Sequence, residues 1–164
     1  MLHGHKLPSE TDKQPDDFVF FIFRDPRDVI VSISYYFDTP LNQAIKDAIR
    51  GRPGATGPRR YPIMEYVRTW LDSGVADCAI QYERLHTDIR SEMYAIIDTL
   101  GVDPLRGILG VVHRQAFGRR KDGPGDKHMR KGIIGDWRNH FTSRQHRRLW
   151  RAIGSEMERL GYGF

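Results

Sequence analysis

The stretch FVFFIFR, residues 18–24, constrains the fold of this chain more than any other segment. Its apolar residues follow one another without the alternation of a half-exposed strand, which predicts a strand buried on both faces, as in a parallel sheet. DPRD follows directly and resembles a helix start, because Asp25 can cap free amides and Pro26 suits the first helical position. Asp28 completes a pattern like a capping box. The sequence therefore predicts a strand that turns abruptly into a helix, which ends near DTP (38–40).

Helical and strand patterns alternate along the rest of the chain. ADCAIQYERL (76–85) is a second apolar strand that ends in a polar turn. Gly101 is expected to end one helix, and Thr142 or Ser143 to cap the last one. Helices are expected over residues 41–50, 61–74, 86–103, 104–117 and 142–162, and Gly-rich basic loops over 51–60 and 118–141. This alternation predicts an α/β layer fold in a single domain, residues 1–164.

Composition narrows the partners and the compartment. The net charge of +5 and the pI of about 9.5 favour an anionic partner, either nucleic acid, an acidic membrane surface or a small phosphorylated ligand. No apolar run comes near the ~20 residues that a membrane span needs, and the first ten residues lack the apolar core of a signal peptide. The single Cys78 excludes an internal disulfide and offers no zinc pattern, so a cytoplasmic setting is expected.

Two charged clusters are candidates for an anion site. Arg24 stands at the end of the first strand, where ligands of open α/β sheets bind and where a helix start offers free amides. Ser32, two helical turns on, could add a hydroxyl; the alternative is that Arg24 only forms a surface ion pair with Asp28. RKG (130–132) places two cations beside a glycine, which suits either a phosphate-binding loop or a basic loop that binds nucleic acid by charge alone.

Taken together, these clusters resemble one family, the sulfotransferases that use 3′-phosphoadenosine-5′-phosphosulfate (PAPS). FIFRDPRDVIVSISYYF resembles the 3′-phosphate-binding signature, in which Ser follows the first Arg of Arg-Asn/Asp-x-Arg/Lys-Asp by eight residues. RKGIIGDWRNHFT is similar to the C-terminal signature Arg-Lys-Gly-x-x-Gly-Asp-Trp at every fixed position. YERLHTDIRSEMYAIIDTLG resembles the Tyr-Glu-Asp-Leu segment. The resemblance runs from about residue 5 to the C-terminus and implies a P-loop-NTPase-like parallel sheet flanked by helices.

The resemblance also implies a role for individual residues in binding the nucleotide. Arg24 and Ser32 would hold the 3′-phosphate from the strand side, and the segment Arg130, Lys131, Gly132 would close over it. Tyr82 would contact the adenine, and Phe117 would stack on it, although both residue types are also common in cores. The residues implied in binding PAPS are Arg24, Ser32, Tyr82, Phe117, Arg130, Lys131 and Gly132. No metal is implied, because cations and amides neutralise the phosphates.

The N-terminal HGHKLP resembles the family segment Lys-x-His-x-Pro, whose His acts as the general base. His5 is the closest match and His3 the second choice, while the alternative is an N-terminal tail without a catalytic role. The implied reaction is transfer of a sulfuryl group from PAPS to a hydroxyl or amine, with release of adenosine 3′,5′-bisphosphate (PAP). The acceptor, a small molecule, a glycan or a lipid, is not readable from the sequence, and a homo-oligomer is compatible with it.

Two other functions compete with this interpretation: a PAP-binding module without turnover, and a basic nucleic-acid-binding domain that uses RQHRRLWR and GRRKDG. The family's 5′-phosphosulfate loop, Pro-Lys-Ser/Thr-Gly-Thr, precedes the His segment and has no match among these residues. We therefore expect the sheet to lack its N-terminal first strand and that loop. A fragment or mis-started reading frame is the favoured explanation; a degenerate domain, or a second chain that supplies the loop, are the others.

Overall fold

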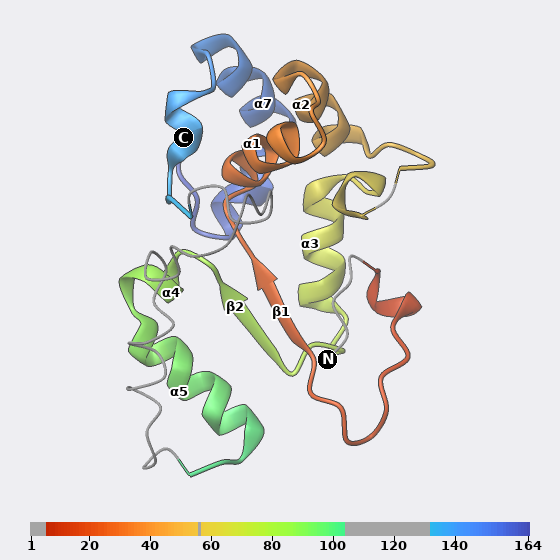
Figure 1. Cartoon of the computed structure of the whole chain (residues 1–164), viewed down its shortest axis with the longest axis vertical. Helices are drawn as coiled ribbons and strands as arrows, with labels where there is room; N and C mark the ends of the chain where they lie inside the picture. The colour runs from red at the N-terminus through yellow and green to blue at the C-terminus, as the bar shows by residue number, and fades with distance from the viewer. Residues whose placement is uncertain (1–5, 56, 104–131) are drawn as a thin grey trace.

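Two parallel strands lie at the centre of the structure (Figure 1). This computed structural model describes residues 6–55, 57–103 and 132–164. β1 (Phe20–Phe23) pairs in parallel with β2 (Cys78–Gln81), with Phe20 opposite Cys78 and Phe23 opposite Gln81. Both strands lie within the segments predicted as strands, and helices pack against them, so the α/β class is confirmed.

The expectation that β1 is buried on both faces is wrong for the described residues. Phe21 is buried and stacks on Trp70 of α3 (Ile63–Asp72), with ring centroids 5.3 Å apart. Ile22 points to the opposite face, and its side chain is 55% exposed. Helix α5 (Ile89–Leu100) packs against β2 and does not extend over β1, as Figure 1 shows. Each strand therefore has a helix on one side only within the described part of the chain.

Helix α1 (Pro26–Tyr36) begins where the sequence predicts. Asp25 is its N-cap, and a side-chain oxygen of Asp25 accepts a hydrogen bond from the Arg27 amide at 2.9 Å. Asp28 does not complete a capping box, contrary to the expectation. Its carboxylate instead accepts hydrogen bonds from two backbone amides more than one hundred residues further along the chain. A long-range contact has replaced the local one.

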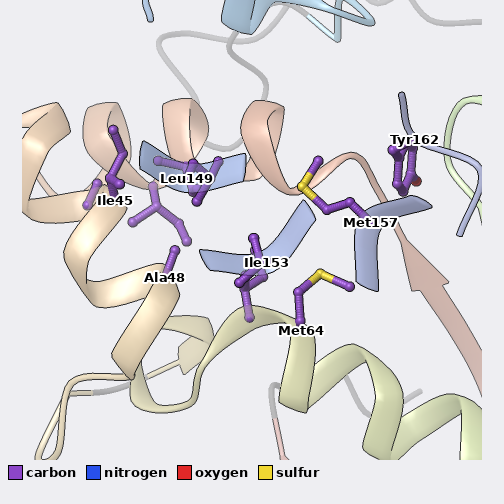
Figure 2. Close-up of a cluster of buried hydrophobic side chains, with 11 residues drawn as sticks. Ile45, Ala48, Met64, Leu149, Ile153, Met157 and Tyr162 are labelled. Atoms are coloured by element: carbon purple, nitrogen blue, oxygen red, sulfur yellow. The ribbon is translucent and has the colours of Figure 1, made fainter. Parts of the chain in front are cut away.

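The helices α1, α2 (Leu41–Arg50), α3 and α7 (Ser143–Arg159) pack around one apolar core beyond the carboxyl end of β1 (Figures 1 and 2). The buried members of this core are Ile30, Ile33, Ala44, Ile45, Ala48, Ile63, Met64, Leu149, Ile153, Met157 and Tyr162. Burial of a large apolar side chain contributes about 1.5–3 kcal/mol. The core therefore fixes the C-terminal helix against the first strand–helix unit.

Local signals at helix ends are confirmed elsewhere in the fold. Thr142 caps α7 in a capping box with Gln145, and Gly101 ends α5 in the left-handed conformation with φ +63°. Short helices complete the described elements: η1 (Pro8–Glu10), η2 (Gly57–Arg60), α4 (Arg84–Thr87) and η3 (Asp136–Asn139).

The helix expected over 104–117 and most of the basic loop after it lie outside the described residues. Within the described ranges, no helix is long and apolar enough to cross a membrane. The same ranges hold no group of three or more His, Cys, Asp or Glu side chains that could bind a metal ion.

Candidate functional site

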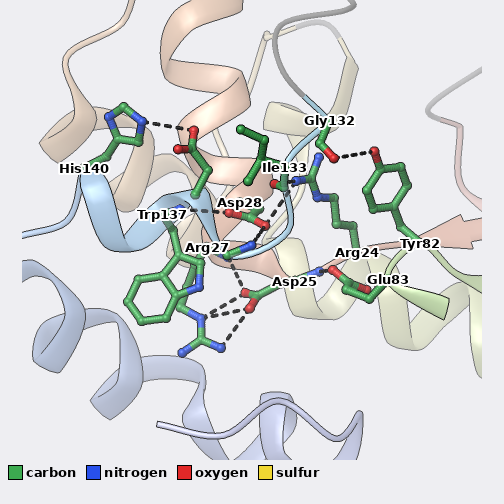
Figure 3. A network of polar contacts seen from close by, with 12 residues as sticks. Arg24, Asp25, Arg27, Asp28, Tyr82, Glu83, Gly132, Ile133, Trp137 and His140 are labelled. Carbon is green, nitrogen blue, oxygen red and sulfur yellow. Dashed lines mark hydrogen bonds and ion pairs between the residues drawn. The ribbon is translucent and has the colours of Figure 1, made fainter. Parts of the chain in front are cut away.

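Arg24 directly follows β1 and stands where the chain turns into α1 (Figure 3). One guanidinium nitrogen, Nη2, donates hydrogen bonds to the carbonyl of Ile133 at 2.6 Å and to the Asp28 carboxylate at 3.1 Å. The Nε of Arg24 is buried and has no hydrogen-bond partner among the described residues. The Asp28 carboxylate offsets part of the charge of Arg24, and the Arg24 side chain is about 20% exposed.

Tyr82 follows β2, so it occupies the equivalent place on the neighbouring strand. The backbone amide of Tyr82 donates to the carbonyl of Phe23 at 2.8 Å, which holds the two strand ends side by side. The Arg24 guanidinium lies 4.4 Å from the centre of the Tyr82 ring, a cation–π contact. Burial raises the pKa of the Tyr82 hydroxyl, and the charge of Arg24 opposes that rise. The hydroxyl is therefore a neutral donor at physiological pH.

The segment from Gly132 to Gly135 closes over both side chains. Its first carbonyl, that of Gly132, accepts from the Tyr82 hydroxyl at 3.4 Å, and its second accepts from Arg24 (Figure 3). Gly135 has φ +76°, and a Cβ there would lie 2.6 Å from the guanidinium of Arg138. A glycine at this position therefore permits both the left-handed turn and the close packing of the next residues.

Asp28 joins this segment to α1. Its side chain is 1% exposed and accepts from the amides of Gly135 at 2.7 Å and of Trp137 at 2.9 Å, as well as from Arg24. Arg24 and Asp28 do form an ion pair, as the alternative interpretation expected. It is not a surface pair, because the carboxylate is buried and accepts hydrogen bonds from three donors.

A second arginine, Arg27, is part of a buried scaffold behind the strand end. Its guanidinium makes a two-pronged ion pair with Asp25, with Nη2 to Oδ2 at 2.8 Å, and lies 4.1 Å from the Trp137 ring centre. It also donates to the carbonyl of Gly163 and lies 3.2 Å from the His146 ring. Burial and the adjacent Arg27 charge lower the pKa of His146.

Glu83, next to Tyr82, connects three parts of the chain. One carboxylate oxygen accepts from the backbone amide of Asp25 at 2.8 Å, and the other accepts from the hydroxyl of Tyr162 at 3.0 Å. Burial raises the pKa of that hydroxyl, so Tyr162 stays a donor. The sequence reasoning assigned no role to Glu83. The available signal was a carboxylate two residues after the second strand.

The structure brings Arg24, Tyr82 and Gly132 together, three of the residues singled out from the sequence. Ser32 is exposed on α1, one helical turn beyond Asp28, which is itself four residues after Arg24. The other sequence candidates lie outside the described residues: His3, His5, Phe117, Arg130 and Lys131.

A separate cavity of about 180 Å³ lies between α3 and α7, and none of the candidate residues lines it. The cluster at the strand ends thus combines a partly satisfied cation, an aromatic ring, a glycine-containing segment and a helix N-terminus. Such a combination can bind a phosphorylated ligand with an aromatic base, because guanidinium groups and helix-start amides bind phosphate and a ring can contact a base.

Comparison with known proteins gives this cluster a family context. The family model described as the sulfotransferase domain matches residues 13–161. Human sulfotransferase 1E1 is 26% identical over 157 residues, covering 79% of this chain and 51% of that protein. Mouse sulfotransferase 2A1 is 32% identical over 152 residues, covering 76% of this chain and 51% of the mouse protein. The chain thus spans about half the length of the curated relatives that it matches.

Solved structures show the same fold. Mouse sulfotransferase SULT7A1, crystallised with PAP, matches with a TM-score of 0.69 at 21% identity. The match covers 85% of this chain and 58% of the mouse chain. Retinol dehydratase in a complex with retinol and PAP has a TM-score of 0.70 at 19% identity, covering 85% of this chain and 47% of its own. These matches confirm the P-loop-like α/β fold expected from the sequence.

Proposed function

Since the chain belongs to the sulfotransferase domain family, we propose that it transfers a sulfuryl group from PAPS to a hydroxyl or amine acceptor and releases PAP. Solved proteins of this fold bind PAP, which supports PAPS as the donor here. The activity is a proposal for this chain, because the chain covers about half of each curated relative.

The observation that carries the proposal is the convergence of Arg24, Tyr82 and Gly132 at the carboxyl ends of two parallel strands. Arg24 is proposed to bind the 3′-phosphate with Ser32, because its Nε is unpaired within the described ranges and the carbonyl on its Nη2 is replaceable by a phosphate oxygen. Tyr82 is proposed to lie against the adenine.

The residues outside the described ranges complete the proposed site. Arg130 and Lys131 would close over the 3′-phosphate from the loop, and Phe117 would stack on the adenine. His5, or His3 in its place, would take the proton of the acceptor while the acceptor oxygen or nitrogen bonds to sulfur. The bond between sulfur and the phosphate oxygen breaks, and the leaving phosphate is stabilised by cations and amides.

The proposal predicts that the purified protein binds PAP more tightly than AMP, which lacks the 3′-phosphate. A hydrogen bond to a charged group contributes about 1.5–3 kcal/mol, so Arg24→Ala and Arg130→Ala should each weaken PAP binding roughly 10- to 150-fold. AMP binding should change little. Isothermal titration calorimetry with both nucleotides measures this preference.

Arg144→Ala is the matched control, because it removes the same charge from an exposed position on α7. It should leave the preference for PAP intact. Equal weak binding of PAP and AMP to the wild-type protein would contradict the proposed site. A nucleic-acid-binding domain would instead bind any polyanion, with an affinity that falls steeply as salt rises.

Turnover separates the enzyme from a module that only binds the nucleotide. PAPS is incubated with the protein and a panel of phenols, alcohols and amines, and the release of PAP is measured by chromatography. His5→Ala should lower turnover more than it lowers PAP binding. Tight PAP binding without turnover on any acceptor would favour the PAP-binding module.

A further inference from the structure

Asp28 is a buried carboxylate beside the candidate site, and the proposed chemistry gives it no part. It is a negative charge, 1% exposed, whose Oδ2 lies 3.1 Å from the cation proposed to bind phosphate. On Coulombic grounds alone, an anion beside Arg24 weakens the binding of a second anion. The position of Asp28 beside Arg24 therefore needs an explanation other than its charge.

The contacts of Asp28 indicate what that role is. Oδ2 accepts both from Arg24 and from the Gly135 amide, and Oδ1 accepts from the Trp137 amide (Figure 3). One rigid carboxylate on α1 thus fixes the direction of the Arg24 guanidinium and the path of the C-terminal segment. A buried carboxylate with charge-assisted bonds holds such a geometry firmly.

The anchored segment leads directly to the other proposed phosphate ligands. Gly132 lies three residues before Gly135, so the two Cα atoms are at most ~11 Å apart. Arg130 and Lys131 directly precede Gly132 in the sequence. Asp28 therefore fixes a segment that directly adjoins these two residues in the sequence.

We propose that Asp28 is a positioning residue for the 3′-phosphate. Its carboxylate aligns Arg24 and anchors the segment Gly132–Gly135 beside it. This inference rests on the proposed function. It adds a residue that acts through others and does not itself touch the ligand.

Positioning and simple charge predict opposite signs for Asp28→Asn. This variant has nearly the same shape but removes the negative charge and presents an N–H₂ group to backbone amides that are themselves donors. If Asp28 only neutralised Arg24, PAP would bind more tightly to the variant. If Asp28 positions the site, PAP binding weakens, by at least about 10-fold, while AMP binding changes much less.

Two further variants keep the test decisive. Asp47→Asn is the matched control, because Asp47 is a buried carboxylate on α2 that contacts Gln43 and Arg52, outside the site. It should lower the melting temperature without changing the ratio of PAP to AMP affinity. Gly135→Ala keeps the carboxylate and Arg24 but strains a residue at φ +76°, and it should reduce the ratio as Asp28→Asn does.

Both affinities are measured by calorimetry on folded protein, and hydrogen exchange of the peptide spanning 132–140 gives a second readout. Faster exchange there and a reduced ratio in Asp28→Asn are the expected results. An unchanged ratio, or tighter PAP binding, would overturn the positioning role and leave the proposed function standing. A wild-type protein without preference for PAP would overturn the proposed function, and this inference with it.

Discussion

Two arginines three residues apart have opposite environments, which shows how burial assigns roles at the scale of single residues. The Arg24 side chain is 20% exposed and retains an unpaired nitrogen within the described ranges. Arg27 is 4% exposed, pairs with Asp25 and donates to Gly163. Only the first can exchange a protein contact for a ligand without leaving a buried charge unpaired. The second is a structural cation.

Replacing Arg27 with Met should therefore destabilise the fold strongly. The substitution leaves the buried Asp25 carboxylate without its guanidinium, and breaking a buried pair costs about 3–5 kcal/mol of the free energy of unfolding. Urea denaturation followed by far-UV circular dichroism measures the loss. Arg60→Met is the control, because the Arg60–Glu10 pair is exposed and screened by water, so its loss should change stability much less. A similar loss in both variants would contradict the structural role of Arg27.

At the scale of elements, α7 combines a local start signal with a long-range core. Its capping box is formed by Thr142 and Gln145, and Leu149, Ile153 and Met157 recur along its buried face. The cap sets where the helix begins, and these three apolar residues set which face packs against α1, α2 and α3. Both signals are readable from the sequence.

Thr142→Ala should lower the free energy of unfolding by about 0.5–2 kcal/mol, because the Gln145 amide loses its hydroxyl acceptor. Thermal and urea unfolding measure the difference. Ser143→Ala, at the first helical position, is the neighbouring control and should change stability by much less. Equal effects of the two substitutions would show that the cap contributes nothing specific.

The features of this fold that the sequence predicted are those determined by residues close together in the chain. Asp25 before Pro26, Thr142 before α7 and Gly101 after α5 all act within one helical turn. Asp25 and Gly101 are where they were expected, and Thr142 is one of the two caps expected for α7. The motifs also selected residues that meet at the strand ends. The partners of Asp28 could not be predicted, because no local pattern says which amides, 107 and 109 residues away, will reach a carboxylate. The exposure of Ile22 likewise depends on where distant helices pack.

At the scale of the whole molecule, the sheet carries exposed apolar side chains outside the apolar core. Ile22 of β1 is 55% exposed and Phe18, just before the strand, is 51% exposed. Both belong to the segment whose unbroken hydrophobicity predicts burial. Exposed apolar residues on a strand promote association between molecules.

Ile22→Thr should therefore reduce concentration-dependent association of the purified protein, while the melting temperature changes little, because Thr keeps a high strand propensity. Sedimentation velocity over a range of concentrations measures the association. Val102→Thr changes an equally exposed residue that follows α5, away from the strands, and should leave association unchanged. Association that persists in Ile22→Thr would place the contact on another surface.

The bonds from Asp28 to Gly135 and Trp137 also have a consequence for protein synthesis. Asp28 leaves the ribosome 107 residues before Gly135. At 5–20 residues per second, the interval is roughly 5 to 20 s. During that time the nascent chain can form the first strand and helix but holds the carboxylate without its amide partners. The segment Gly132–Gly135 is therefore fixed beside Arg24 only after the chain has been translated past Trp137.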